Sequence, residues 1–193
     1  MGLRQQVRGA VRVLSQDVSW SLHHFVMNSV AGSFATPRAA RLVIYRLMGV
    51  NLETTAIFDR CTIVGSGPVS IGRGSFINRE CYFEAVAPIT IGADTAVAMQ
   101  VAFVTSTHPF DDAGRFSAEP EGRPVVVGDR CWVGARAMIL PGVTVGDDVV
   151  VAAGAVVTRD CASGGLYAGV PARRIRDIGS GPRSASGKQG EAP

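Results

Sequence analysis

The sequence predicts an all-β solenoid, in which one chain coils through short strands around a single hydrophobic core. The first observation is a period of six between Val125 and Asp160, where branched aliphatic residues recur without a slip. They are Val127, Val133, Ile139, Val145, Val151 and Val157. The second observation is that a small or branched residue lies four positions after each of the first five. Three such faces close a triangular coil of about 18 residues, whereas a β-sandwich does not explain six repeats at one fixed period.

The period of six begins at Ile57 and assigns the apolar positions to three faces of the coil. Face A holds residues 57, 77, 97, 133 and 151, face B holds 63, 83, 103, 139 and 157, and face C holds 71, 91, 127 and 145. Two steps are eight residues long and one is 24, and all three fall at the corner between faces B and C. The long step is therefore a loop, residues 109–126, on an intact solenoid. Four full coils and two further faces give about 4.7 coils.

The solenoid, residues 51–168, is flanked by segments of different character. Residues 1–50 contain apolar residues at helical spacing from Val7 to Leu22, and a second helix with Thr36 as N-cap, Pro37 at its first position and Gly49 at its end. The simplest interpretation is two amphipathic helices packed on the main domain. Because this region has six Arg and one Asp, the alternative is contact with an anionic or membrane-linked substrate. A short basic segment follows at 169–179, and we expect a disordered tail at 180–193.

Composition excludes several functional classes. The net charge of +3, without a Lys- or Arg-rich run, does not indicate nucleic-acid binding. No apolar run approaches the ~18 residues that span a bilayer, and no signal peptide is recognised, which predicts a cytoplasmic protein. Cys61, Cys81 and Cys131 occupy small inward positions of their hexads, so we expect buried free thiols. No CxxC motif or His cluster indicates a metal site.

The chain resembles the hexapeptide-repeat acyltransferases, most closely the galactoside, maltose and nodulation-type O-acetyltransferases and the O-acetyltransferases of polysaccharide pathways. The resemblance covers residues 55–179 and is carried by the hexads, STHPF, CWVGARAMILPGVTVG and AGVPARRIRDI. It implies a left-handed parallel β-helix, although chain physics alone favours right-handed crossovers. It also implies a homotrimer that uses acetyl-CoA, which lies in the cleft between neighbouring subunits.

The resemblance also implies roles for residues that match the family's motifs. Trp132 would lie beside the thioester arm, and the backbone amides of Ala135 and Ala153 would bind the pantetheine. The Ala135 amide is in addition a candidate oxyanion donor. Thr158, Arg159, Arg173 and Arg176 would lie toward the nucleotide, where cations suit phosphates.

His108 is the candidate catalytic base. Acyl transfer from a thioester to an alcohol needs a base for the hydroxyl proton, and His has a suitable pKa near neutrality. It is the only His of the solenoid and lies at the B/C corner where the loop departs. No activated Ser or Cys nucleophile is evident, so we expect direct attack in a ternary complex, without an acyl-enzyme.

The acceptor is the least defined part of the predicted site. Galactoside and maltose acetyltransferases carry an acceptor-binding Asn where this chain has Glu84, in NRECYFEAV. Glu84 and Asn78, at the start of that segment, are the candidate acceptor ligands, and the alternative for Glu84 is a solvated surface position. The predicted function is O-acetylation of a sugar, glycan or small metabolite. An N-acyltransferase for an amino sugar, a serine-type O-acetyltransferase and a non-catalytic scaffold remain as alternatives.

Overall fold

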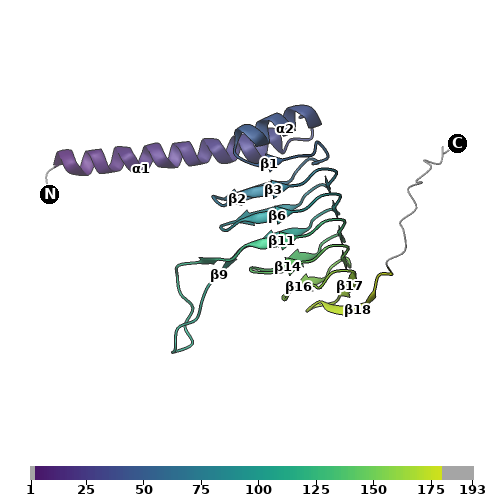
Figure 1. Ribbon diagram of the computed structural model, residues 1–193. Helices are drawn as coiled ribbons and strands as arrows, with labels where there is room; N and C mark the ends of the chain where they lie inside the picture. Colours follow the sequence, from purple (N-terminus) through teal and green to yellow (C-terminus); the bar gives the residue numbers. More distant parts are fainter. Residues whose placement is uncertain (1–2, 180–193) are drawn as a thin grey trace.

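The computed structural model describes residues 3–179 and shows a three-sided β-solenoid with a helical cap at its N-terminal end (Figure 1). Its sides are sheets of five, six and five strands, and consecutive coils pair in parallel. The strands are short because the chain turns a corner after each hexad. The predicted all-β solenoid is thus confirmed.

Each predicted face corresponds to one sheet. Face A contains β4 (Phe76–Ile77), β7 (Ala96–Val97), β12 (Trp132–Val133), β15 (Val150–Val151), β17 (Gly165–Ala168) and β18 (Arg173–Asp177). Face B contains β2 (Thr62–Gly65), β5 (Tyr82–Ala85), β8 (Ala102–Val104), β13 (Met138–Ile139) and β16 (Val156–Val157). Face C contains β1 (Asn51–Leu52), β3 (Val69–Ile71), β6 (Ile89–Ile91), β11 (Val125–Val127) and β14 (Thr144–Val145).

The long step between residues 103 and 127 leaves the coil register intact. Val127 pairs with Ile91 of the preceding coil and with Val145 of the following one, as the loop interpretation requires. The solenoid is longer than predicted, with about six turns in place of about 4.7. Leu52 adds a position before Ile57, while Cys161 and Tyr167 continue faces C and A after Val157.

The core is a column of inward side chains, one per face and coil. All the predicted apolar positions from Ile57 to Val157 are buried, with exposed fractions between 0 and 4%. Phe83 and Phe103 stack on neighbouring coils with ring centroids 5.1 Å apart. The four cysteines are buried and free, three of them in the small inward slots predicted for them. Hydrogen bonding with Cys81, together with burial, raises the pKa of the Cys61 thiol, which favours its neutral form.

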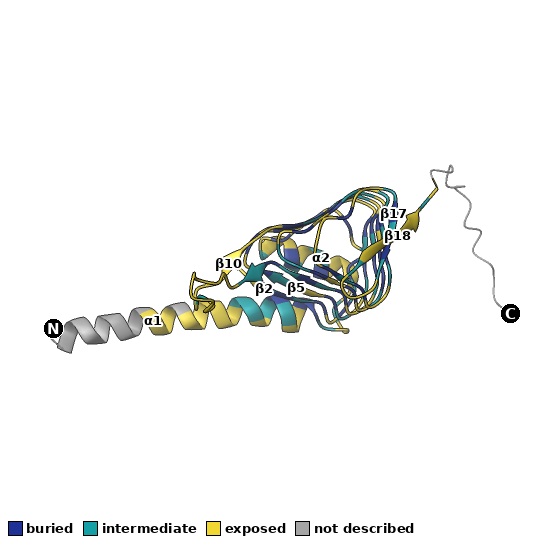
Figure 2. Ribbon diagram, turned by 90° about the horizontal axis from the view of Figure 1, so that it is seen from below, coloured by how far each residue is buried: buried dark blue, intermediate teal, exposed yellow. Residues whose placement is uncertain are grey.

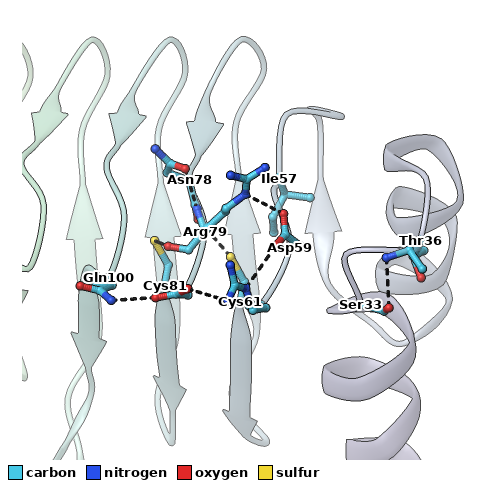
Figure 3. A network of polar contacts seen from close by, with 12 residues as sticks. Ser33, Thr36, Ile57, Asp59, Cys61, Asn78, Arg79, Cys81 and Gln100 are labelled. Atoms are coloured by element: carbon cyan, nitrogen blue, oxygen red, sulfur yellow. Dashed lines mark hydrogen bonds and ion pairs between the residues drawn. The ribbon is translucent and has the colours of Figure 1, made fainter.

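The corner between faces A and B is lined by polar side chains that link consecutive coils (Figure 3). Arg60 pairs with Glu80 at 3.1 Å, Gln100 Nε2 donates to Glu80 at 2.7 Å, and Arg136 Nε donates to Gln100 at 2.7 Å. All four residues have φ near +60°. Each of the four lies three residues after the inward side chain of face A. The backbone at this position therefore adopts the left-handed conformation in each of these coils, although none of the four residues is glycine.

Three helical segments precede the solenoid: α1 (Leu3–His24), a π-helix η1 (Phe25–Ala31) and α2 (Arg38–Leu47). The α1 helix projects sideways beyond the solenoid, and only its end reaches the first coil (Figure 1). Leu14, Val18 and Leu22 are 58 to 64% exposed. The prediction that this part of α1 packs on the main domain is therefore wrong. None of the described helices is long and apolar enough to cross a membrane. Contact with a membrane stays a prediction.

The α2 helix begins one residue later than predicted. Pro37 occupies the N-cap, and the Thr36 hydroxyl donates to the Val30 carbonyl at 2.6 Å, so Thr36 is not the capping residue. Gly49 follows the end of the helix with φ +90°, as its predicted C-terminal role requires.

Side chains from the helical segments form hydrogen bonds with the backbone at the N-terminal edge of each sheet. Asn28 accepts from the Ile63 amide at 2.8 Å and donates to the Ile63 carbonyl at 3.0 Å, as a neighbouring strand would. Arg41 donates to the Ile57 carbonyl at 3.0 Å, and Arg46 Nε donates to the Leu52 carbonyl at 2.8 Å. One edge residue on each face is therefore paired by a side chain of the cap.

The C-terminal end is closed by an antiparallel pair. β18 runs back along β17, and the amide of Ala172 donates to the Val156 carbonyl at 2.8 Å. This places the short basic segment predicted at 169–179 against the last coil. The tail predicted to be disordered, 180–193, lies outside the described residues.

Candidate active site

His108 lies at the base of a loop that leaves the corner between faces B and C. β9 (Ser106–Thr107) pairs antiparallel with β10 (Glu121–Gly122), and the Arg123 amide donates to the Thr105 carbonyl at 2.7 Å. The loop therefore departs and returns as a hairpin, and it is exposed along most of its length (Figure 2). His108 follows β9 directly, so its backbone is tied to the solenoid while its side chain is exposed.

The imidazole of His108 is oriented by the loop itself. Its Nδ1 lies 2.8 Å from the Ser117 carbonyl oxygen. A carbonyl can only accept, so this hydrogen bond requires that Nδ1 carry the proton and leaves Nε2 as the lone-pair nitrogen. Phe116 contacts the ring edge-on at a centroid distance of 6.1 Å. The arrangement leaves the Nε2 lone pair of His108 available on an accessible corner.

Glu84 lies on β5, one coil before the loop, and its carboxylate is not a free surface group. Glu84 Oε2 accepts from the amides of Thr105 and Ser106 at 2.9 and 3.0 Å. The solvated-surface alternative for Glu84 is therefore wrong. Its other predicted role, as an acceptor ligand, stays a prediction, because both contacts use Oε2 and not Oε1.

The second predicted acceptor ligand lies elsewhere. Asn78 is in the turn before β5, at the corner between faces A and B, where its side chain accepts from the Arg79 amide at 2.8 Å (Figure 3). Glu84 lies near the other end of β5. Asn78 therefore lies at the A/B corner and Glu84 near the B/C corner, and no hydrogen bond joins them within the described residues.

The predicted pantetheine-binding residues lie on a different side of the solenoid from His108. Trp132 is 57% exposed on face A, and Ala135 and Ala153 follow at the corner with face B. Their backbone amides have no hydrogen-bond partner within residues 3–179, so both can bind a ligand. Gly134 permits the close spacing here, because a Cβ at this position would lie 2.5 Å from the Ala153 nitrogen.

The predicted nucleotide-binding residues fall into two groups. Thr158 and Arg159 are exposed at the B/C corner, on the same edge as His108 and two coils further along. Arg173 and Arg176 are exposed on β18, and within the described part of the chain neither pairs with a carboxylate. The neighbouring Arg174 differs, since it binds Asp177 at 2.9 Å and the Tyr167 hydroxyl at 3.0 Å.

One chain therefore does not bring the predicted site together. In a three-sided solenoid the B/C corner lies opposite face A, so His108 and Trp132 project in different directions. The structure does join His108 directly to Ser117, and Glu84 binds the backbone of Thr105 and Ser106 that leads to His108. Sequence reasoning gave no role to Thr105 or Ser117, because their contributions are a buried hydroxyl and a backbone carbonyl.

Comparisons with known proteins agree with this architecture. A family model described as the hexapeptide repeat of succinyl-transferase matches residues 124–159. The galactoside O-acetyltransferase of Escherichia coli is 34% identical over 110 residues, which are 57% of this chain and 54% of that protein. A Staphylococcus aureus protein named "Putative acetyltransferase" is 34% identical over 169 residues, 86% of this chain and 80% of that protein.

A solved structure extends the likeness to three dimensions. The hexapeptide-repeat-containing acetyltransferase of Vibrio cholerae, complexed with acetyl coenzyme A, is 26% identical with a TM-score of 0.69, covering 83% of this chain and 88% of that one. The solenoid and its extruded His loop thus define a hexapeptide-repeat protein. The chain belongs to the hexapeptide-repeat acetyltransferase family. It spans only about half the length of the first curated relatives that it matches.

Proposed function

We propose that this protein is an acetyl-CoA-dependent O-acetyltransferase that acts on a hydroxyl group of a sugar or glycan. The observation that carries the proposal is the His108 imidazole, fixed by the Ser117 carbonyl so that Nε2 is free at an accessible corner. Family membership supplies the reaction class, and the names of the galactoside O-acetyltransferase and of the acetyl-CoA complex support the acceptor and the donor. A cytoplasmic location, where acetyl-CoA is available, is part of the proposal.

In the proposed reaction His108 Nε2 takes the proton of the acceptor hydroxyl as its oxygen attacks the thioester carbonyl. A C–O bond forms and the carbonyl becomes an oxyanion, toward which the Ala135 amide is the candidate donor. When the intermediate collapses, the C–S bond breaks and the imidazolium returns its proton to the departing thiolate. All four cysteines are buried, so the described chain offers no accessible thiol for an acyl-enzyme. The acetyl group then passes directly from coenzyme A to the acceptor.

The positions of the candidate residues favour a site shared between subunits. Trp132 lies on face A, opposite the corner that carries His108, and Ala135 and Ala153 lie at the corner between faces A and B. We therefore infer a homotrimer, in which face A of one subunit faces the B/C corner of the next. Coenzyme A would lie in this cleft, with Thr158 and Arg159 from one subunit and Arg173 and Arg176 from the other near its phosphates.

Release of free thiol from acetyl-CoA tests the function directly. Wild-type protein is assayed with sugars, oligosaccharides, amino sugars and hydroxylated metabolites. His108→Ala should lower kcat by about 10²–10⁴-fold on the active acceptor, because a positioned base is lost. His23→Ala is the matched control and should retain activity. Near-normal kcat in His108→Ala, or an isolable acetylated protein, would contradict the mechanism, and activity confined to amino sugars would indicate the N-acyltransferase alternative.

A further inference from the structure

We infer that Glu84 is a positioning residue whose carboxylate holds the backbone that leads to His108. The inference rests on the proposed function, because it assigns Glu84 to the geometry of the base. Glu84 would thus act through His108, and the acceptor would be bound by other groups. Three sets of contacts support this assignment: those of the carboxylate, those of Thr105 and the β9–β10 pair.

The carboxylate binds the chain at the point where it leaves the solenoid. Glu84 pairs in register with Val64 on one side and Val104 on the other, so it is the one carboxylate among three aligned positions. The two amides that it accepts belong to the residues directly after Val104, where β8 ends. A carboxylate that accepts two N–H groups forms charge-assisted bonds, which are stronger than neutral ones.

The backbone of the same coil binds Thr105 from the other side. The Thr105 hydroxyl donates to the Glu84 carbonyl at 2.7 Å and accepts from the amides of Val86 and Ala87 at 2.9 and 3.0 Å. Thr105 is fully buried. Together with the Glu84 carboxylate, these bonds use the hydroxyl and the amide of Thr105 and the amide of Ser106.

This anchored segment controls where the imidazole lies. Ser106 is two residues before His108, and the β9–β10 pair that follows is only two residues long on each side. The short hairpin therefore depends on its root for its direction. A displacement of about 1 Å in a catalytic group can cost about 10²-fold in rate, so loosening this root should reduce turnover.

An acceptor-binding role would use a different atom of the same carboxylate. Both amides bind Glu84 Oε2, so an acceptor hydroxyl would bind Oε1. Kinetics distinguish the two roles, because a positioning residue changes kcat, whereas an acceptor ligand changes the acceptor KM.

The test compares Glu84→Ala and Glu84→Gln in the full-length protein. Glu84→Ala should lower kcat roughly 10–100-fold while the acceptor KM stays within about twofold. Glu84→Gln should retain most of the activity, because the side-chain oxygen of Gln accepts the same two amides. Glu80→Ala is the matched control: Glu80 lies in the same coil and also bridges coils, but at the A/B corner.

Two further measurements separate positioning from general destabilisation. In a His108→Ala background, Glu84→Ala should change the residual rate less than twofold, because no base remains to be positioned. Hydrogen exchange of the 104–107 segment should accelerate in Glu84→Ala but not in Glu84→Gln or Glu80→Ala.

A raised acceptor KM with unchanged kcat would overturn the inference and make Glu84 an acceptor ligand. Unaltered exchange in Glu84→Ala, or inactive Glu84→Gln with normal exchange, would overturn it as well. Exchange needs no turnover, so it reports on the anchor even if no acceptor is acetylated. If exchange accelerates only in Glu84→Ala and no acceptor is acetylated by the wild-type protein, the proposed function is contradicted, but the anchoring role of Glu84 is supported.

Discussion

The carboxylate of Asp59 lies in the first coil, where it joins that coil to the next (Figure 3). Arg79 Nε donates to it at 2.8 Å and Arg60 Nε at 3.3 Å. Burial by itself would raise the pKa of Asp59, but the hydrogen bonds from the two arginines outweigh this effect and hold the pKa below its ordinary value. The ion pairs therefore favour the folded state whenever Asp59 is charged.

This pKa shift predicts a stability contribution that depends on pH. Because the pKa is lower in the folded state, the contribution is complete above the unfolded pKa of about 3.9 and is lost as the pH falls through the folded value. Asp59→Asn should therefore lower the free energy of unfolding near neutral pH and have little effect in strong acid. Urea unfolding across this range measures the difference. A gap between the two proteins that stays constant with pH would contradict the assignment.

Single residues also show how much of the candidate site could be predicted from the sequence. His108 could be predicted as the candidate base, because its motif and its position at the B/C corner are both visible in the sequence. Its partner Ser117 contributes only a carbonyl oxygen, nine residues away on an irregular loop, and no side-chain chemistry marks such an atom. The bonds from Glu84 join different coils, so they depend on a register that only the folded chain defines.

Among the elements, α2 contributes the most completely bonded side chain of the cap. Arg41 is 3% exposed and donates to four carbonyls, those of Ala31, Ser33, Thr36 and Ile57, at 2.7 to 3.1 Å. Arg41→Ala should leave these carbonyls without their donor and lower the free energy of unfolding by about 3–5 kcal/mol. Thermal and urea unfolding measure the loss. Arg38→Ala, on the exposed side of the same helix, should change stability far less.

The strand β18 combines a structural and a predicted binding role in neighbouring arginines. Arg173→Ala should raise the KM for acetyl-CoA, through roughly 1–2 kcal/mol of lost charge-assisted bonding, without lowering stability. Arg174→Ala should do the reverse, since its guanidinium binds Asp177 and Tyr167. Steady-state kinetics and melting curves of both variants provide the comparison. Truncation after Gly179 should leave the KM for acetyl-CoA within about twofold of the wild-type value. If the truncation raises this KM more than Arg173→Ala does, the predicted position of the nucleotide site is wrong.

The faces of the solenoid could be predicted and its corners could not. Each face repeats a large inward side chain, which leaves a period in the sequence. The corners repeat a backbone conformation instead, and Arg60, Glu80, Gln100 and Arg136 share no property that signals a positive φ. The N-terminal cap escaped prediction for a related reason: Asn28 and Arg41 act on coils more than fifteen residues away.

At the scale of the whole molecule, the proposed site needs two copies of the chain. Light scattering should report a trimer at assay concentrations. Mixed trimers of His108→Ala and Trp132→Ala subunits should recover part of the wild-type activity, because some clefts combine an intact His108 with an intact Trp132. Each variant alone is the control. An active monomer, or mixtures no more active than the two variants separately, would place the complete site within one chain.

The solenoid's extent was underestimated because its first and last positions are irregular. Leu52 precedes Ile57 by five residues and Cys161 follows Val157 by only four, so the period of six misses both steps. Tyr167 follows Cys161 by six residues, but it lies beyond this break in the period. The left hand of the coil came from the resemblance alone. The period of six defines the interior of the solenoid better than its ends, and it carries no information on the hand of the coil.

The two capped ends have a consequence for the protein in concentrated solution. A parallel coil pairs equally well with the next coil of its own chain and with a coil of another chain. Asn28, Arg41 and Arg46 occupy the bonding groups at one end, and β18 with the 169–172 segment covers the other. Without them the solenoid would have two adhesive ends and could grow by end-to-end addition into a fibre. The caps therefore set the length of the particle.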